Sequence, residues 1–244
     1  MIAASLNAAL GRAGLMLMLV ASVFGAFTVL YGIRRSEQRL LRLAPRYAWL
    51  AFAGIFCCIC MAVPIVHLVP LVTGIGLSGE TAVSLLFVLM ASGMVGRISF
   101  GLLADRVGGL YAYFTASATQ TAMVFWFTQT NQLPALYALA IAFGFGYAGV
   151  MTTLIICGRE AAPLRITGFG VAVVTTTAWI GMGIGSYQGG YFYDLTGNYA
   201  WSFGNAAISG TINLCVVALL IWYRRNSTGG WQPVRLRPQP TVLG

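Results

Sequence analysis

Few side chains in this sequence could bind a charged ligand, and three of them stand in residues 96–109, GRISFGLLADRVGG. Arg97 lies about two turns before the end of a long apolar run. A guanidinium can hold a carboxylate through two parallel hydrogen bonds, and a charge at this position is costly in lipid unless it faces protein or water. Arg97 is therefore a candidate ligand for a small organic anion. Alternatively, it reaches the lipid headgroups or pairs with Asp105 or a backbone carbonyl.

The short turn that follows combines two charges with glycines. Asp105 can face the N-terminus of a helix, where the partial charge is positive, and Arg106 can pair with an acid or a lipid phosphate. Gly101 and Gly108 permit a close approach and a tight turn. This pattern favours ionic contacts that hold one conformation rather than catalysis.

His67, the one histidine of the chain, lies between Pro64 and Pro70 in another apolar run. Histidine changes charge near neutral pH, and proline-interrupted helices often mark binding sites in transporters. The alternative is a structural histidine near the end of its helix. Cys57-x-x-Cys60 has no second pair and no nearby histidine or acid, which favours apolar filler over a metal or redox site.

The remaining composition excludes most other chemistry. The five acidic residues are scattered, so no catalytic or metal-binding set forms, and a phosphate-binding loop of the Gly-x-x-x-x-Gly-Lys type is absent because the chain has no lysine. The sequence therefore predicts neither an enzyme nor a bound metal or cofactor.

Membrane helices are the elements that must position these residues. Of the 244 residues, 59% are hydrophobic and 8% are charged, against about 25% charged in soluble domains. Several apolar runs reach the roughly 20 residues that a helix needs to cross a bilayer. The fold class is predicted as an all-α, polytopic helix bundle with about seven spans: 13–33, 47–73, 81–103, 110–129, 134–157, 167–191 and 200–223.

The positions of the arginines indicate on which side of the membrane each connecting segment lies. They cluster in residues 34–46, in the turn at 104–109, in 158–166 and from 224 onward, while Arg12 alone lies on the other side. By the positive-inside rule, this alternation places the N-terminus outside and the C-terminus in the cytoplasm. The net charge of +9 thus reflects topology rather than nucleic-acid binding. We expect an integral protein of a bacterial cytoplasmic (inner) membrane, in contact with its lipids.

Glycines form stripes in two of the later spans. Gly181, Gly185 and Gly189 recur at i, i+4 and i+8 and fall on one helix face. Small residues let helix backbones approach closely in lipid, so these three are predicted to pack against another helix. A contact lined by glycine could also slide during a conformational change.

The pattern Gly101-x-Leu103-Ala104-Asp105-Arg106-x-Gly108 resembles the loop signature of the major facilitator superfamily. Three further stretches resemble that family's helix six, helix-eleven entry and helix-eleven exit: Leu10-Gly11-Arg12, Pro163–Gly170 and Gly181–Tyr199. The resemblance implies a helix-six-like span in 1–33, a linker in 34–46, a six-helix C-terminal bundle in 47–223 and a cytoplasmic tail in 224–244. It also implies that Gly101, Asp105, Arg106 and Gly108 form a conformational latch.

Within that superfamily, His67-Leu68-Val69-Pro70 and Gly96-Arg97-x-x-x-Gly101 are most similar to the monocarboxylate and oxalate–formate carriers. The resemblance implies secondary active transport of a small, monocarboxylate-like anion bound by Arg97, with a coupling proton. His67, Thr176 and Trp179 would lie on the same pathway. Two positions depart from the pattern: Gly93 replaces an acidic residue, and the region of Thr175–Thr177 and Trp179 lacks the lysine of the oxalate–formate carriers.

The family architecture places the substrate between two six-helix bundles. This chain resembles one bundle plus one helix, so we expect a separately encoded N-terminal half, a homodimer, or a truncated product. A non-transporting membrane subunit or sensor built on the same half-fold is the alternative function.

Overall fold

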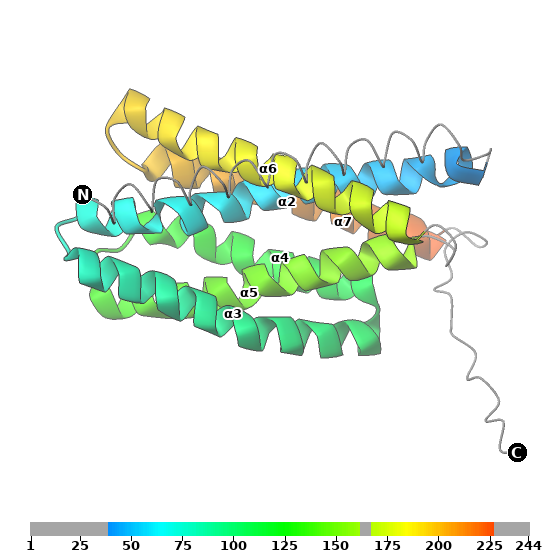
Figure 1. Cartoon of the computed structure of the whole chain (residues 1–244), viewed down its shortest axis with the longest axis horizontal. Coiled ribbons are helices and arrows are strands. Elements are labelled where there is room, and N and C mark those ends of the chain that lie inside the picture. Colours follow the sequence, from blue (N-terminus) through cyan, green and yellow to red (C-terminus); the bar gives the residue numbers. More distant parts are fainter. Residues whose placement is uncertain (1–38, 162–166, 227–244) are drawn as a thin grey trace, which may run out of the picture. The chain divides into compact units, whose positions relative to one another are not determined.

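The computed structural model describes residues 39–161 and 167–226, all in helices or short turns (Figure 1). The predicted span at 13–33 and the tail from residue 227 lie outside the described residues. The α-helices are α2 (Arg39–Gly74), α3 (Gly79–Val107), α4 (Gly109–Val124), α5 (Leu133–Glu160), α6 (Thr167–Thr196) and α7 (Ala200–Asn226). A 3-10 helix, η1 (Phe125–Thr128), directly continues α4.

These helices match the six later spans predicted from hydropathy. Four segments of the described residues are long and apolar enough to cross a membrane: Ala48–Gly74, Gly79–Val107, Leu133–Glu160 and Ala200–Asn226. The most visible difference is at α2, which begins at Arg39, inside the stretch assigned to the linker. Arginine is a good helix former, so the charged residues before a span can continue its helix.

Short turns join α2 to α3, α3 to α4 and α6 to α7, and the joined helices are antiparallel. Ser78 caps α3 by accepting a hydrogen bond from the Thr81 N–H at 3.2 Å. Gly108, with φ +91°, ends α3 and begins α4 without an intervening loop. A left-handed φ of this kind is costly for any residue with a Cβ, which explains the glycine at this joint.

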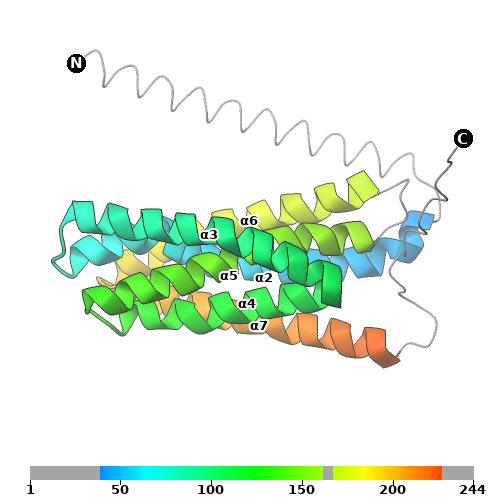
Figure 2. The same cartoon turned by 90° about the horizontal axis from the view of Figure 1, so that it is seen from below.

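Within the compact unit that begins at Pro45, α5 lies beside α3, α4 and α6, and α4 also packs against α7. Figure 2 shows α4 between α5 and α7. Glycine residues lie where α3 and α5 approach each other most closely. A Cβ on Gly93 would lie 3.1 Å from the Cβ of Ala148, and Gly96 packs directly on the Phe145 carbonyl. Hence α3 and α5 touch almost backbone to backbone, as small residues allow in membranes.

A buried polar cluster ties α2, α4 and α7 together. The Tyr113 hydroxyl donates to Asn213 Oδ1 at 3.0 Å, and Asn213 Nδ2 donates to Ser117 Oγ. Gln120 Nε2 donates to the carbonyl oxygen of Cys57 at 3.3 Å. All five side chains are fully buried. Such hydrogen bonds between helices stabilise membrane bundles because an unpaired polar group is costly in an apolar interior.

The Tyr113→Phe variant should be less stable than the wild type by about 1–2 kcal/mol, because it leaves Asn213 Oδ1 without its donor. Reversible unfolding in mixed detergent micelles measures the change. Tyr111→Phe is the matched control, since the Tyr111 ring is exposed on the same helix and should tolerate the change. Equal losses in the two variants would contradict a specific role for the cluster.

Candidate functional site

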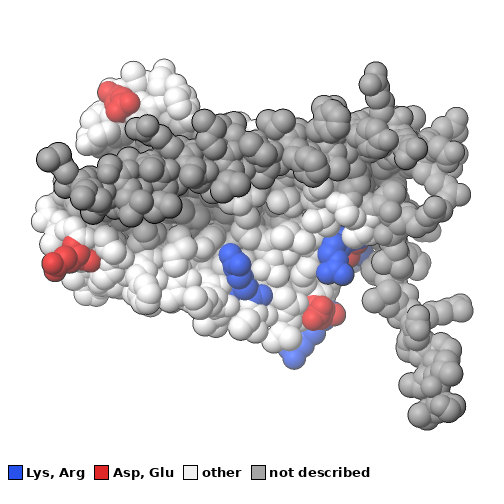
Figure 3. Space-filling view, in the orientation of Figure 1, with Lys and Arg blue, Asp and Glu red and all other residues white. Residues whose placement is uncertain are grey.

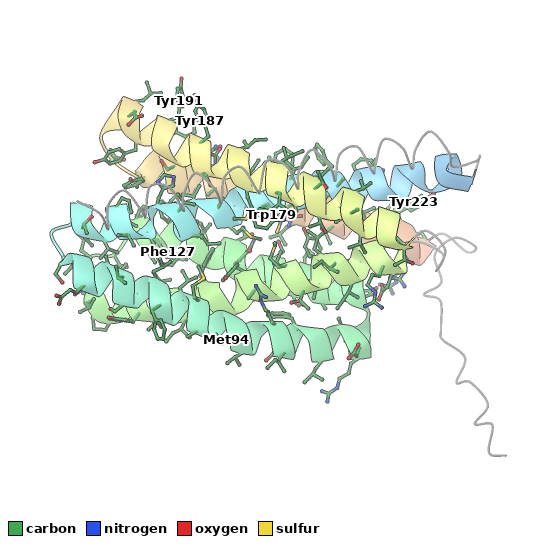
Figure 4. The ribbon with its side chains drawn as sticks, viewed as in Figure 1. Met94, Phe127, Trp179, Tyr187, Tyr191 and Tyr223 are labelled. Atoms are coloured by element: carbon green, nitrogen blue, oxygen red, sulfur yellow. The ribbon has the colours of Figure 1, made fainter. Side chains whose placement is uncertain are left out.

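Arg97 lies on an exposed, otherwise apolar stripe of α3. Its neighbours on the stripe are exposed hydrophobic residues, Val83, Phe87, Met90, Met94, Ile98 and Leu102. Figure 4 shows Met94 on the outward side of α3. Arg97 stands ten positions before Val107, which is about 15 Å along the helix axis. Within the described residues, no hydrogen bond or ion pair is formed by its guanidinium, so it is available to an external anion.

The other charges gather at the ends of the helices. Glu80 in the first turn of α3 and Asp194 near the end of α6 lie at one end, and Arg106, Arg159 and Arg225 lie at the opposite end. Among described basic side chains, Arg97 is the one away from a helix end. Figure 3 shows the same pattern, with an isolated basic side chain amid uncharged surface.

The turn between α3 and α4 contacts a carboxylate at the end of α5. Asp105 and Arg106 are exposed. It is Glu160, at the end of α5, whose Oε1 accepts a hydrogen bond from the Gly109 N–H at 3.1 Å. A carboxylate at this position stabilises the N-terminus of α4. The sequence contains one indication of this contact, because Glu160 follows a predicted span that ends on the same side of the membrane as this turn.

Gly109 makes this contact sterically feasible. A Cβ there would lie 2.9 Å from Ile156 Cγ2 and 3.2 Å from Glu160 Oε1. These are closer than ordinary van der Waals contacts, so the Ile156 and Glu160 side chains would have to shift to make room for a larger residue. The glycine pair at 108 and 109 therefore serves both the turn and its contact with α5.

The Glu160→Ala variant should lose about 1 kcal/mol of stability, because the N-terminus of α4 loses its carboxylate acceptor. Thermal unfolding in detergent measures the change. Asp105→Ala is the control and should be close to neutral, since Asp105 is exposed. A larger loss for Asp105→Ala than for Glu160→Ala would show that the roles are reversed.

His67 joins α2 to α6 rather than to the region of Arg97. Its Nε2 donates to the Ser186 carbonyl at 2.9 Å, and Gly189 leaves room for the ring. Tyr199 lies beside it, with ring centroids 5.5 Å apart. By residue count along the helices, His67 and Arg97 differ in height by roughly 17 Å. The structure does not bring these two predicted site residues together.

Tyr199 extends this contact to the turn between α6 and α7. Its ring stacks on Tyr193 with centroids 4.4 Å apart. Burial raises the pKa of the Tyr199 hydroxyl, and the nearby Tyr193 and Asp194 raise it further. Tyr199 is therefore a neutral phenol near neutral pH, because its ordinary pKa of about 10 already lies well above 7.

Helix α6 has one face against α2 and another that is exposed. Gly181, Gly185 and Gly189 lie against Ile55, Ile59 and His67 of α2. Thr176 and Trp179 are exposed on α6. Figure 4 labels Trp179 together with Tyr187 and Tyr191, which stack with ring centroids 6.2 Å apart. Arg97 lies on α3, whereas Thr176 and Trp179 lie on α6. Both helices pack against α5.

No protein-family model matches the chain. Two similar curated proteins are monocarboxylate transporter 13 of Bos taurus, 30% identical over 151 residues, and that of Rattus norvegicus, 30% identical over 146 residues. Each alignment covers 58% of this chain, and it covers 34% and 33% of the respective relative. An MFS-type transporter of Aspergillus fumigatus is 26% identical over 147 residues, covering 59% of this chain and 32% of that protein.

Among solved structures, the E. coli fucose:proton symporter FucP has a similar fold, with a TM-score of 0.61 and 17% sequence identity. The match covers 74% of this chain and 44% of FucP. The chain is an integral membrane protein with an all-helical, major-facilitator-like fold, which confirms the predicted fold class. Its relatives are transporters rather than enzymes, and the resemblance to the monocarboxylate carriers is confirmed. The chain spans about a third of the length of the curated relatives it matches.

Proposed function

We propose that this chain forms part of a secondary active carrier for a small organic anion of the monocarboxylate class. The observation that carries the proposal is Arg97, an exposed guanidinium far from both ends of an apolar helix, with no acceptor among the described residues. Lipid is a poor environment for this group, so the face that bears it must meet protein or water. A carboxylate supplies the geometry and charge that a guanidinium binds best.

The exposed residues of α6 complete the proposed pathway. Thr176 offers a hydroxyl and Trp179 a large ring, and both lie on a helix that packs on α5, as α3 does. His67 holds the far end of this helix against α2 through the Ser186 carbonyl. In this proposal, His67 sets the position of one pathway wall, and a proton accompanies the anion.

The loop of Gly101, Asp105, Arg106 and Gly108 is proposed to be the conformational latch. The contact between Glu160 and Gly109 fixes this loop to α5, and the charges of Asp105 and Arg106 stay exposed. A second bundle could therefore pair with them in one state of the carrier. Reversing a conformational equilibrium from 1:99 to 99:1 takes about 5.5 kcal/mol, to which a few charge contacts buried against the second bundle would contribute.

The proposed carrier needs a second bundle, supplied by a separately encoded half or by a second copy of this chain. The charge distribution supports a topology with the arginine-rich helix ends in the cytoplasm. In this orientation Arg106, Arg159 and Arg225 face the cytoplasm, while Glu80 and Asp194 lie outside. The proposed location is a bacterial cytoplasmic membrane.

Uptake by proteoliposomes tests the proposal. The protein is purified from membranes in which its own locus is expressed, so that a second half remains present. Labelled monocarboxylate should enter faster than into protein-free vesicles, and an inward proton gradient should accelerate entry. Entry at the protein-free rate under both conditions would contradict transport and favour a non-transporting subunit.

A further inference from the structure

His67 has one ring nitrogen in a hydrogen bond and one without a partner among the described residues. Its Nε2 lies 2.9 Å from the carbonyl oxygen of Ser186, which can only accept a hydrogen bond. The hydrogen therefore stays on Nε2 whether the imidazole is neutral or charged, and Nδ1 is the atom that takes up a proton. Gly189 lies against the same edge of the ring, since a Cβ there would overlap Cδ2 and Nε2. The ring is thus held with its Nε2 edge toward α6.

The groups around His67 can accommodate a positive charge on its ring. The Tyr199 ring lies beside the imidazole with centroids 5.5 Å apart, within the distance at which an aromatic ring attracts a cation. Tyr193 stacks on Tyr199, and the carboxylate of Asp194 lies near this pair. Glu80, in the first turn of α3, is at the same end of the bundle and is also acidic. No basic side chain of the described residues lies at this end to repel the charge.

The two helices that His67 joins are supported differently at this contact. On α6, the Gly189 carbonyl accepts a hydrogen bond from Ser202 Oγ at 2.8 Å, which fixes this turn of α6 to α7. On α2, Pro64 and Pro70 flank His67, and each removes one hydrogen bond from the helix. A helix bends more readily at such positions than where its hydrogen bonds are complete. His67 therefore connects a bendable part of α2 to an anchored part of α6.

We propose that His67 is a proton-binding site, with the proton taken up at Nδ1, and that the bound proton tightens the contact between α2 and α6. A hydrogen bond from a charged donor is roughly twice as strong as one between neutral groups, so the imidazolium Nε2–H holds the Ser186 carbonyl more firmly. Histidine changes charge between about pH 5 and pH 8, so the contact responds to acidification near neutrality. The site needs only α2, α6 and the Tyr199 ring, and it is independent of anion transport.

Nitrogen NMR of the intact protein in lipid nanodiscs tests the site directly. His67 is the one histidine of the chain, so isotopically labelled histidine gives the imidazole signals of this residue alone when purification avoids a histidine tag. At about pH 8, Nε2 should carry a hydrogen and Nδ1 should not. On acidification to about pH 5, the Nδ1 signal should shift to that of a protonated nitrogen while Nε2 keeps its hydrogen. A bare Nε2 at about pH 8, or an unprotonated Nδ1 at about pH 5, overturns the proposal.

Thermal unfolding of the wild type and the His67→Gln variant tests the tightening of the contact. Glutamine offers an amide N–H near the position of Nε2 but cannot take up a proton, and all other titrating groups are shared. Between about pH 8 and pH 5, the difference in melting temperature should widen in favour of the wild type by about 2–4 °C. An unchanged difference, or one that widens in favour of the variant, overturns the tightening. The NMR measurement uses the wild type and stands even where the variant fails to fold.

Discussion

Replacement of Arg97 by alanine is expected to lower the apparent affinity for a transported monocarboxylate about a hundredfold, which corresponds to about 3 kcal/mol. The guanidinium is the charged group of the described bundle that lies at mid-depth on an exposed face. Hydrogen bonds to charged groups are worth more than neutral ones, and a carboxylate without its cation is poorly solvated inside a carrier. Concentration-dependent uptake into proteoliposomes measures the change as an increased KM.

Two variants separate binding from folding at this position. Arg97→Lys keeps the charge but cannot form two parallel hydrogen bonds to a carboxylate, so its KM should lie between those of the alanine variant and the wild type. Ile98→Ala removes an exposed neighbour on the same helix and should leave KM unchanged. If Arg97→Ala transports with the wild-type KM, Arg97 does not bind the carboxylate.

Replacement of Gly185 by alanine is expected to destabilise the bundle by about 2 kcal/mol. The added Cβ would lie 2.7 Å from the Ile59 carbonyl oxygen and 2.8 Å from the Cβ of Ala62. Both contacts are far below van der Waals separation, and one of them is to the α2 backbone, which cannot rotate away as a side chain can. Helices α2 and α6 would have to separate.

Gly183 supplies the matched control, since it lies two positions away in the same helix and a Cβ there meets nothing within 4 Å. Gly183→Ala should be neutral or should stabilise by up to about 1 kcal/mol, because alanine is the better helix former. Thermal unfolding in detergent should show Gly185→Ala melting about 4–8 °C below wild type. Equal melting temperatures for the two variants would contradict close packing at Gly185.

Hydropathy and charge were sufficient to predict the helices of the described region. The span predicted at 134–157 is α5, Leu133–Glu160, and the span predicted at 200–223 is α7, Ala200–Asn226. Each helix extends slightly beyond its apolar run because polar residues can continue a helix into the headgroup region. The period of the glycines in α6 predicted a packing face, but it carried no information on which helix would be the partner.

The contacts that sequence reasoning missed depend on pairs of residues. Glu160 and Gly109 are 51 positions apart, and Tyr113 and Asn213 are 100 positions apart. Each residue taken alone has an ordinary interpretation, a charge at a helix end or a polar residue in an apolar run. Only the lateral order of the helices shows that these groups meet. The same limit applies to His67: its place near the end of its span predicts a structural histidine distant from Arg97, but its partner on α6, the Ser186 carbonyl, follows only from the helix packing.

Exchange across the membrane tests the central claim, carrier-mediated transport of a small organic anion, most directly. Proteoliposomes preloaded with unlabelled monocarboxylate should take up labelled monocarboxylate several times faster than empty ones. Preloading with the neutral amide of the same acid should give no acceleration, because it lacks the charge that Arg97 is proposed to bind. Acceleration by the acid alone is the predicted result; identical rates in the acid-loaded, amide-loaded and empty vesicles would contradict the account.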